Sequence, residues 1–167
     1  MEIIPLLFNN NMVNIINKIE NSKNAKLDFK RIRDLDRNSK IDRYDEDGKY
    51  CVKHKVVEIY KTNYKQECMG KHKVIISMPG YIKAEYDKEC GCSDATLFMY
   101  VKNKEESKKV INLLNSKPYK MIINTYREIT GLNNHKNINR LSLIDITKDE
   151  DIYDYFKLTR KEINLIE

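Results

Sequence analysis

The sequence is short of the features that mark several protein classes. It has no tryptophan, five glycines and three prolines, and its longest apolar runs, 3–8 and 74–78, are far too short to span a bilayer. The glycines never cluster, which excludes the Gly-rich strand-to-helix turn of a dinucleotide-binding site. The first residues lack a basic leader and a small-residue cleavage site. We therefore expect an intracellular protein with no membrane partner.

Length and composition indicate one globular domain. A chain of 167 residues, 41% hydrophobic and 34% charged, buries one core and leaves little room for a second. We expect a single domain over 1–167, with a helix and a charged irregular segment in 1–48, strands in 49–102 and helices in 103–167. The expected fold class is α+β, with a small, mostly antiparallel sheet followed by a helix pair and short C-terminal helices.

Local patterns place the first helix and the strands. Apolar residues at helical spacing behind an Asn cap predict a short amphipathic helix, and they are Met12, Ile15, Ile16 and Ile19. β-branched and aromatic residues predict strands, with a Pro-Gly turn among them. The predicted strands cover 50–60, 72–78, 81–87 and 96–102.

The apolar period changes towards four in the last third of the chain. Acidic residues open a helix at 104 that ends near Ser116, and Ser116 caps a second helix that Gly131 ends. We expect a sharp turn between these two helices. Capping-box patterns at Thr147–Glu150 and Thr159–Glu162 predict two short terminal helices.

Four cysteines lie in the strand-rich part, at Cys51, Cys68, Cys90 and Cys92. In an intracellular protein we expect reduced thiols unless a metal organises them. His54 and His72 add possible zinc ligands, but a Cys-x-Cys pair is unusual for zinc and no Cys-x-x-Cys knuckle occurs. Zinc is thus a minor alternative, and we expect no metal and no cofactor. Cys51 with His54 resembles a thiol catalyst but lacks an orienting acid.

The net charge of +6 is unevenly distributed along the chain. Residues 49–83 contain eight lysines against Glu58 and Glu67, and residues 108–140 contain seven basic residues against Glu128. The first block interleaves its lysines with tyrosines and histidines, a mixture suited to phosphates and bases. A lysine surface that only keeps the protein soluble is an equally compatible alternative.

The chain resembles a known family over about 50–167. The segments that carry the resemblance are the strand "KVIIS", the helix end "LLNSK" at 113–117, the stretch 141–145 and the tail 155–167. Together they resemble the C-terminal target-recognition domain of type II DNA adenine methyltransferases, versions of which also occur in large DNA viruses. The departures are Ser142, where the family prefers proline, and Arg160-Lys161, where it prefers acidic residues.

The resemblance implies DNA recognition without catalysis. In that family a catalytic domain with an Asn-Pro-Pro-Tyr-like motif precedes this part, whereas Pro5, Pro79 and Pro118 are all isolated. We therefore expect no catalytic residues and no enzymatic activity of the chain alone. The expected partner is double-stranded DNA, either alone or together with a separate methyltransferase or nuclease subunit.

The expected DNA contacts come from loops at 69–73, 79–83 and 133–140. Lysine and arginine suit phosphates, while histidine and asparagine suit base edges. The candidates are Lys71, His72, Lys73, Tyr81, Lys83, Asn133, Asn134, His135, Lys136 and Arg140. Asn134 and Arg140 are the preferred specificity residues. For Asn133 and Asn134, a turn after the Gly131 helix stop is an alternative interpretation.

Two further functions compete with this interpretation. One is a protein-interaction adaptor that kept the packing of such a domain and lost its DNA contacts. The other is a small metal-dependent nuclease built on Asp45, Asp47, Glu58 and Lys61. The nuclease match is loose, because Glu58 and Lys61 are three residues apart and would point to opposite faces of a strand.

Overall fold

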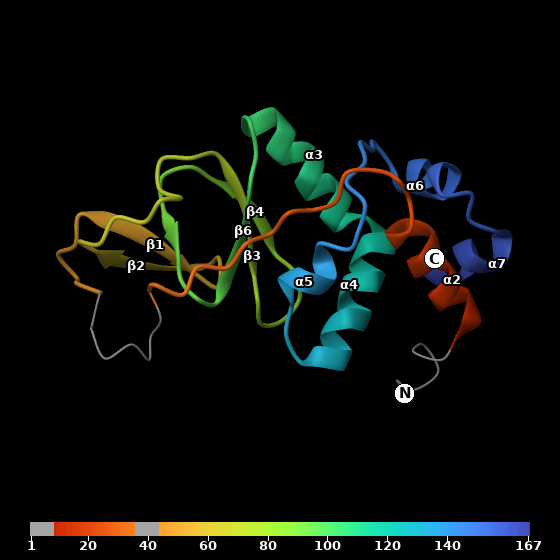
Figure 1. Cartoon of the computed structure of the whole chain (residues 1–167), viewed down its shortest axis with the longest axis horizontal. Helices are drawn as coiled ribbons and strands as arrows, with labels where there is room; N and C mark the ends of the chain where they lie inside the picture. The colour runs from red at the N-terminus through yellow and green to blue at the C-terminus, as the bar shows by residue number, and fades with distance from the viewer. Residues whose placement is uncertain (1–8, 36–43) are drawn as a thin grey trace.

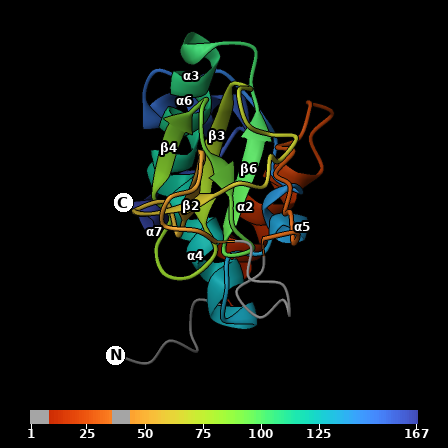
Figure 2. The same ribbon diagram turned by 90° about the vertical axis from the view of Figure 1, so that its left-hand side faces the viewer.

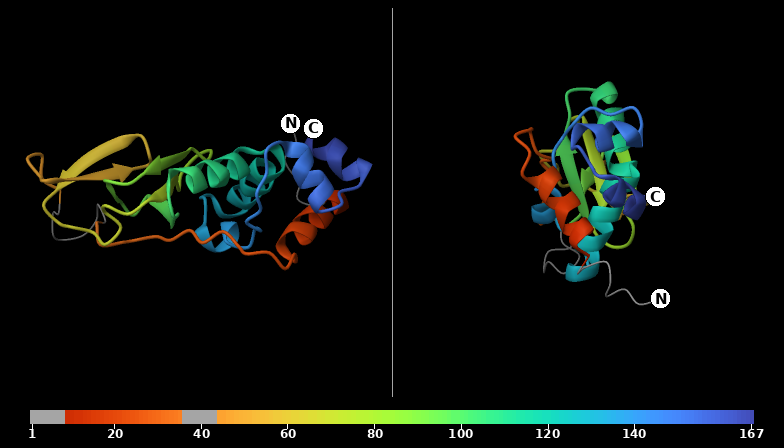
Figure 3. Two further views of the ribbon diagram at one scale, coloured as in Figure 1. Left: turned by 90° about the horizontal axis from the view of Figure 1, so that it is seen from above. Right: turned by 90° about the vertical axis from the view of Figure 1, so that its right-hand side faces the viewer.

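The described chain forms an elongated α+β structure with two three-stranded sheets at one end and most helices at the other (Figure 1, Figure 3). The computed structural model describes residues 9–35 and 44–167. The apolar run at 3–8 and positions 36–43 of the charged segment lie outside these residues. The expected fold class is confirmed, with small, mostly antiparallel sheets followed by a helix pair and short C-terminal helices.

The helix α2 (Asn10–Glu20) forms where the apolar spacing predicts it. Asn9 caps this helix, because its side chain accepts a hydrogen bond from the backbone N–H of Asn11 at 2.9 Å. Its buried residues are Met12, Ile15 and Ile19. The helix packs against α7 (Arg160–Ile166), so segments from the two ends of the sequence lie side by side (Figure 1).

The first sheet has the strand order β2-β1-β5 and corrects one prediction. The stretch 50–60, expected as one strand, is a hairpin of β1 (Tyr50–His54) and β2 (Glu58–Thr62). Lys55 and Val56 form the turn with positive φ angles of 52° and 71°. The Val56 side chain is fully buried, and this packing holds a backbone conformation that β-branched residues seldom adopt. β5 (Gly91–Cys92) pairs with β1 in parallel.

The second sheet has the order β4-β3-β6, and helices cover one of its faces (Figure 2). Its strands are β3 (Lys73–Ser77), β4 (Ala84–Asp87) and β6 (Thr96–Tyr100). All of β3 is buried, because Val74 and Ile76 belong to the main core with the helices while Ile75 belongs to a second cluster. That second cluster consists of Val56, Cys68, Ile75, Cys92 and Phe98. The prediction of one sheet is therefore refined to two.

The helix pair α3 (Lys104–Asn115) and α4 (Lys117–Thr130) is separated by Ser116 alone. Ser116 is the N-cap residue of α4 as expected, but its hydroxyl donates to the carbonyl of Leu113 at 2.6 Å and caps no N–H of α4. Gly131 ends α4 in the left-handed conformation, with φ 78°.

Three short helices complete the fold: α5 (His135–Ile138), α6 (Asp149–Tyr155) and α7. The Thr159–Glu162 capping box at α7 is confirmed. The one at α6 is shifted by a residue, because the partner carboxylate is Asp151 in place of Glu150. Asp151 accepts hydrogen bonds from the backbone N–H groups of Thr147 and Lys148 at 2.8 and 3.0 Å.

Glu162 links α2 to α7, and its neutralisation is expected to destabilise the fold. Its carboxylate accepts hydrogen bonds from Lys18 Nζ and from the backbone N–H of Thr159, both at 2.8 Å. Burial raises the pKa of Glu162, but these hydrogen bonds outweigh burial and set the pKa below its usual value. We expect Glu162→Gln to lower the free energy of unfolding by about 1–3 kcal/mol at pH 7, the typical loss for a charged hydrogen bond.

The sign of the pH dependence follows from the lowered pKa of Glu162. The ionised carboxylate stabilises the fold above the unfolded pKa of about 4.3, and this contribution is lost as the pH falls through the folded pKa. Urea midpoints of wild type and Glu162→Gln should therefore differ at pH 7 and converge near pH 3. Glu105→Gln, at an exposed carboxylate, is the control and should match wild type. An equal difference at both pH values would contradict this role of the charge.

The expectation of four reduced thiols is wrong, because Cys51 and Cys90 form a disulfide. The parallel pairing of Val52 with Gly91 places these two cysteines next to each other, with their Cα atoms 4.7 Å apart. Cys68 and Cys92 are free thiols and are buried. Within residues 9–35 and 44–167, no group of three or more His, Cys, Asp or Glu side chains is arranged to hold a metal. No helix in this part of the chain is long and apolar enough to cross a membrane.

Candidate nucleic-acid interface

Lys73 is one of two predicted DNA-contact residues that the structure buries, so the prediction that it is exposed is wrong. Its side chain is 0% exposed, and Nζ donates to the carbonyls of Cys68 and Lys88, both at 3.1 Å. Nζ also lies 3.5 Å from a carboxylate oxygen of Asp87. Because β3 is covered on both faces, Lys73 supports the fold and does not reach a phosphate in this conformation.

Asn133 is the second buried candidate, and its role is to join two loops. Its side-chain Nδ2 donates to the carbonyls of Ser77 and Gly80 at 2.9 and 3.0 Å, and its backbone N–H donates to Met78 at 2.8 Å. The expectation of an exposed base contact is therefore wrong for Asn133. Its amide instead ties the loop before α5 to the turn between β3 and β4, and Tyr81 follows that turn.

Asn134 is half-buried and caps α5, since its side chain accepts a hydrogen bond from the backbone N–H of Lys136 at 2.9 Å. Both asparagines thus have structural roles in the loop between Gly131 and α5. With Oδ1 engaged in capping, the Asn134 amide nitrogen is the atom left for an outside contact. Asn134 is the N-cap residue of a helix of only four residues. Its capping hydrogen bond therefore helps to fix the positions of the helical side chains that follow it.

Four basic side chains gather around α5, and we call them the α5 patch: Arg31, Arg33, His135 and Lys136. Asn139, which ends α5, exchanges two hydrogen bonds with the backbone of Phe29, at 2.7 and 2.9 Å. This pairing sets the segment 29–33 beside α5. Burial, followed by the positive charges of Lys136, Arg31 and Arg33, lowers the pKa of His135. His135 is therefore neutral at pH 7, in a region of positive potential.

Arg31 and Arg33 were missing from the predicted site. In the sequence they belong to a segment whose acidic and basic residues cancel, and only tertiary contacts bring them to α5. The local signal was the run "KRIR" at 30–33, which contains three cations and no carboxylate. Arg33 and Lys136 are exposed, whereas Arg31 is half-buried and its Nε donates to the carbonyl of Asp94 at 2.8 Å.

Lys71 and His72 lie at the opposite end of β3 from the Tyr81 turn. The five residues of β3 span about 16 Å, which separates these two candidates from the Tyr81 turn. Because Asn133 joins that turn to the loop before α5, Lys71 and His72 are not part of the α5 patch. Lys71 Nζ lies 5.4 Å from the ring centre of Tyr100, and His72 shares a hydrogen bond of 2.6 Å with the Tyr86 hydroxyl. They form a separate aromatic and basic group.

The remaining candidates are exposed to different degrees. Tyr81 is 73% exposed, and Lys83 is also exposed. Arg140 is paired with Glu20 at 2.7 Å, although its side chain is 59% exposed. Glu20 also accepts a hydrogen bond from Tyr126, so Arg140 is tied to the contact between α2 and α4.

Any inference about function depends on the geometry of these residues alone. No protein-family model, no curated protein and no solved structure matches this chain. The resemblance to target-recognition domains therefore stays a prediction.

The residues proposed for a nuclease do not form a metal centre in the described structure. The Asp45 carboxylate accepts from the backbone N–H of Asp47 and from Asn63 Nδ2, both at 3.0 Å, which is a turn-stabilising arrangement. Glu58 accepts from the Tyr60 hydroxyl at 2.8 Å. Neither carboxylate belongs to a metal-binding group among the described residues.

Proposed function

We propose that the protein is a DNA-binding recognition module that contacts the backbone of duplex DNA with the α5 patch. In this proposal the chain has no catalytic centre, and any chemistry comes from a separate methyltransferase or nuclease subunit. The observation that carries the proposal is the convergence of cations from two distant segments, 31–33 and 135–136, on one short helix.

The charge balance of the α5 patch supports an anionic partner. Among the described residues, no carboxylate forms a salt bridge with Arg31, Arg33 or Lys136. Like charges that crowd together repel each other, and DNA phosphates relieve that repulsion and release their counterions on binding. The neutral His135 ring and the Asn134 amide offer donors and acceptors beside the cations.

Removal of two exposed cations from the α5 patch should weaken DNA binding and its salt dependence together. We expect Arg33→Gln combined with Lys136→Gln to lower affinity for duplex DNA about tenfold at low salt. The slope of log K against log salt should fall in magnitude by about 2, since each lost phosphate contact contributes about 0.9. Fluorescence anisotropy of labelled duplexes at several salt concentrations measures both quantities.

The matched control removes two exposed cations from a different helix, with Arg160→Gln and Lys161→Gln at the start of α7. This variant has the same net charge as the α5 variant and should bind DNA like wild type. Equal losses in the two variants would mean that only net charge matters and would refute the α5 patch. Binding to protein partners with little salt dependence, and none to DNA, would favour the adaptor function instead.

A further inference from the structure

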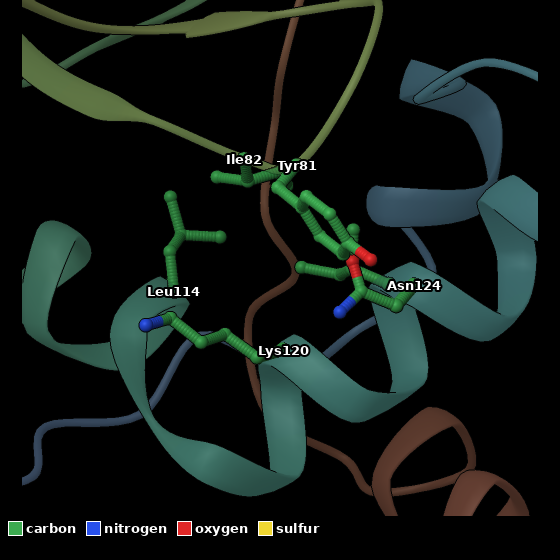
Figure 4. Close-up of a pocket in the computed structure, with 6 residues that line it drawn as sticks. Tyr81, Ile82, Leu114, Lys120 and Asn124 are labelled. Atoms are coloured by element: carbon green, nitrogen blue, oxygen red, sulfur yellow. The ribbon is translucent and has the colours of Figure 1, made fainter.

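A small hollow lies beside α4, at the turn between β3 and β4 (Figure 4). Its volume is about 190 Å³, and we call it the Tyr81 hollow. It is lined by Tyr81, Ile82, Leu114, Lys120, Ile123 and Asn124. Tyr81 and Asn124 stand on one side of it, and Lys120 and Leu114 on the other.

The side chains that line the Tyr81 hollow indicate which kind of ligand fits it. Three aliphatic side chains and the exposed ring of Tyr81 line it, and its polar groups are the Tyr81 hydroxyl, one amide and one ammonium group. No carboxylate lines it. Pockets that hold drug-sized ligands measure roughly 300–1,000 Å³, so this smaller hollow suits a single ring system.

The Tyr81 ring already makes a cation–π contact. The Arg127 guanidinium lies 4.2 Å from the centre of its ring, and Arg127 is not among the residues that line the hollow. A planar ligand therefore has the uncovered face of Tyr81 available for stacking. The guanidinium packs against the tyrosine ring and adds a positive charge next to it.

We propose that the Tyr81 hollow binds one nucleotide unit, with its base against Tyr81 and its phosphate towards Lys120. Base stacking on an exposed aromatic ring accepts any base, and the Asn124 amide supplies one donor and one acceptor for the base edge. The unit comes either from an unpaired nucleotide of a nucleic-acid strand or from a free nucleotide. The first source rests on the proposed DNA-binding function, and the second does not.

Two binding assays on the full chain test the proposal. The first uses anisotropy of a short fluorescein-labelled single strand, with adenosine monophosphate as competitor, and the second titrates adenosine monophosphate alone by calorimetry. We expect Tyr81→Leu to weaken single-strand binding about 5- to 150-fold, the usual range for the loss of one stacked base. Tyr81→Phe should retain binding, because it keeps the ring.

The control is Tyr155→Leu, which removes another exposed tyrosine ring, on α6, away from the hollow. It should bind the single strand like wild type. Single-strand binding that is equal in wild type and Tyr81→Leu, with no titration of adenosine monophosphate, would overturn the proposal. If duplex binding still depends on the α5 patch in that case, the proposed function stands and only the nucleotide site fails.

Another combination of results would support the nucleotide site and contradict the DNA-binding function. If no nucleic acid binds but adenosine monophosphate titrates wild type and not Tyr81→Leu, the hollow is a free-nucleotide site and the DNA-binding function is wrong. If neither nucleic acid nor adenosine monophosphate binds, both proposals are overturned.

Discussion

Replacement of Lys73 by alanine is expected to lower the free energy of unfolding by about 3–5 kcal/mol, the usual loss when one partner of a buried ion pair is removed. The Lys73 side chain is 0% exposed and that of Asp87 is 14% exposed. Without the ammonium group, the Asp87 carboxylate keeps, among contacts with the described residues, only the hydrogen bond from the backbone N–H of Cys90, at 2.7 Å. The carbonyls of Cys68 and Lys88 lose a donor at the same time.

Urea unfolding of Lys73→Ala, compared with that of Lys71→Ala, measures how much more the buried lysine contributes to the free energy of unfolding than its exposed neighbour. The Lys71 side chain is 49% exposed, and its pair with Glu67 is on the surface, so its removal should cost less than about 1 kcal/mol. The double variant Lys73→Met with Asp87→Asn removes both charges and should recover part of the loss, because no unpaired charge remains. Equal midpoints for the two alanine variants would show that Lys73 is not buried.

Lys71 and Lys73 also show why the predicted site was only partly right. Both occur in a basic loop motif, "GKHK", and the sequence gives no means to tell a phosphate contact from a buried cation. The difference arises because Lys73 pairs with Asp87 across β3 and β4, fourteen residues later. Likewise, Asn133 is buried because Ser77 and Gly80 lie opposite it in space.

The fold was more predictable than the site, because helices and turns depend on neighbours in sequence. The Asn9 cap, the Gly131 stop and the Thr159–Glu162 box are all local and were confirmed. The hairpin within 50–60 was missed, because its turn contains Lys55 and Val56 in place of Gly or Asn. The burial of Val56 and a hydrogen bond from the backbone N–H of Lys55 to Thr96 Oγ1, both with residues far along the chain, explain that turn.

The Cys51–Cys90 disulfide was not predictable either, and its reduction is expected to lower the free energy of unfolding by about 2–4 kcal/mol. It closes a chain segment with a sequence separation of 39, which restricts the unfolded chain substantially. It also fastens β5, a strand of two residues, to β1. The first sheet should therefore be the part most sensitive to a reductant.

Thermal unfolding with and without a phosphine reductant tests this expectation. Wild type should unfold at a lower temperature when it is reduced, whereas Cys51→Ala combined with Cys90→Ala should be unaffected by the reductant, since Cys68 and Cys92 are already free. Thiol titration in denaturant should find two thiols before reduction and four after it. Four thiols in the protein as purified without reductant would instead restore the expectation of a fully reduced chain. In that case the close packing of β1 and β5 would rest on the sheet hydrogen bonds and the buried side chains alone.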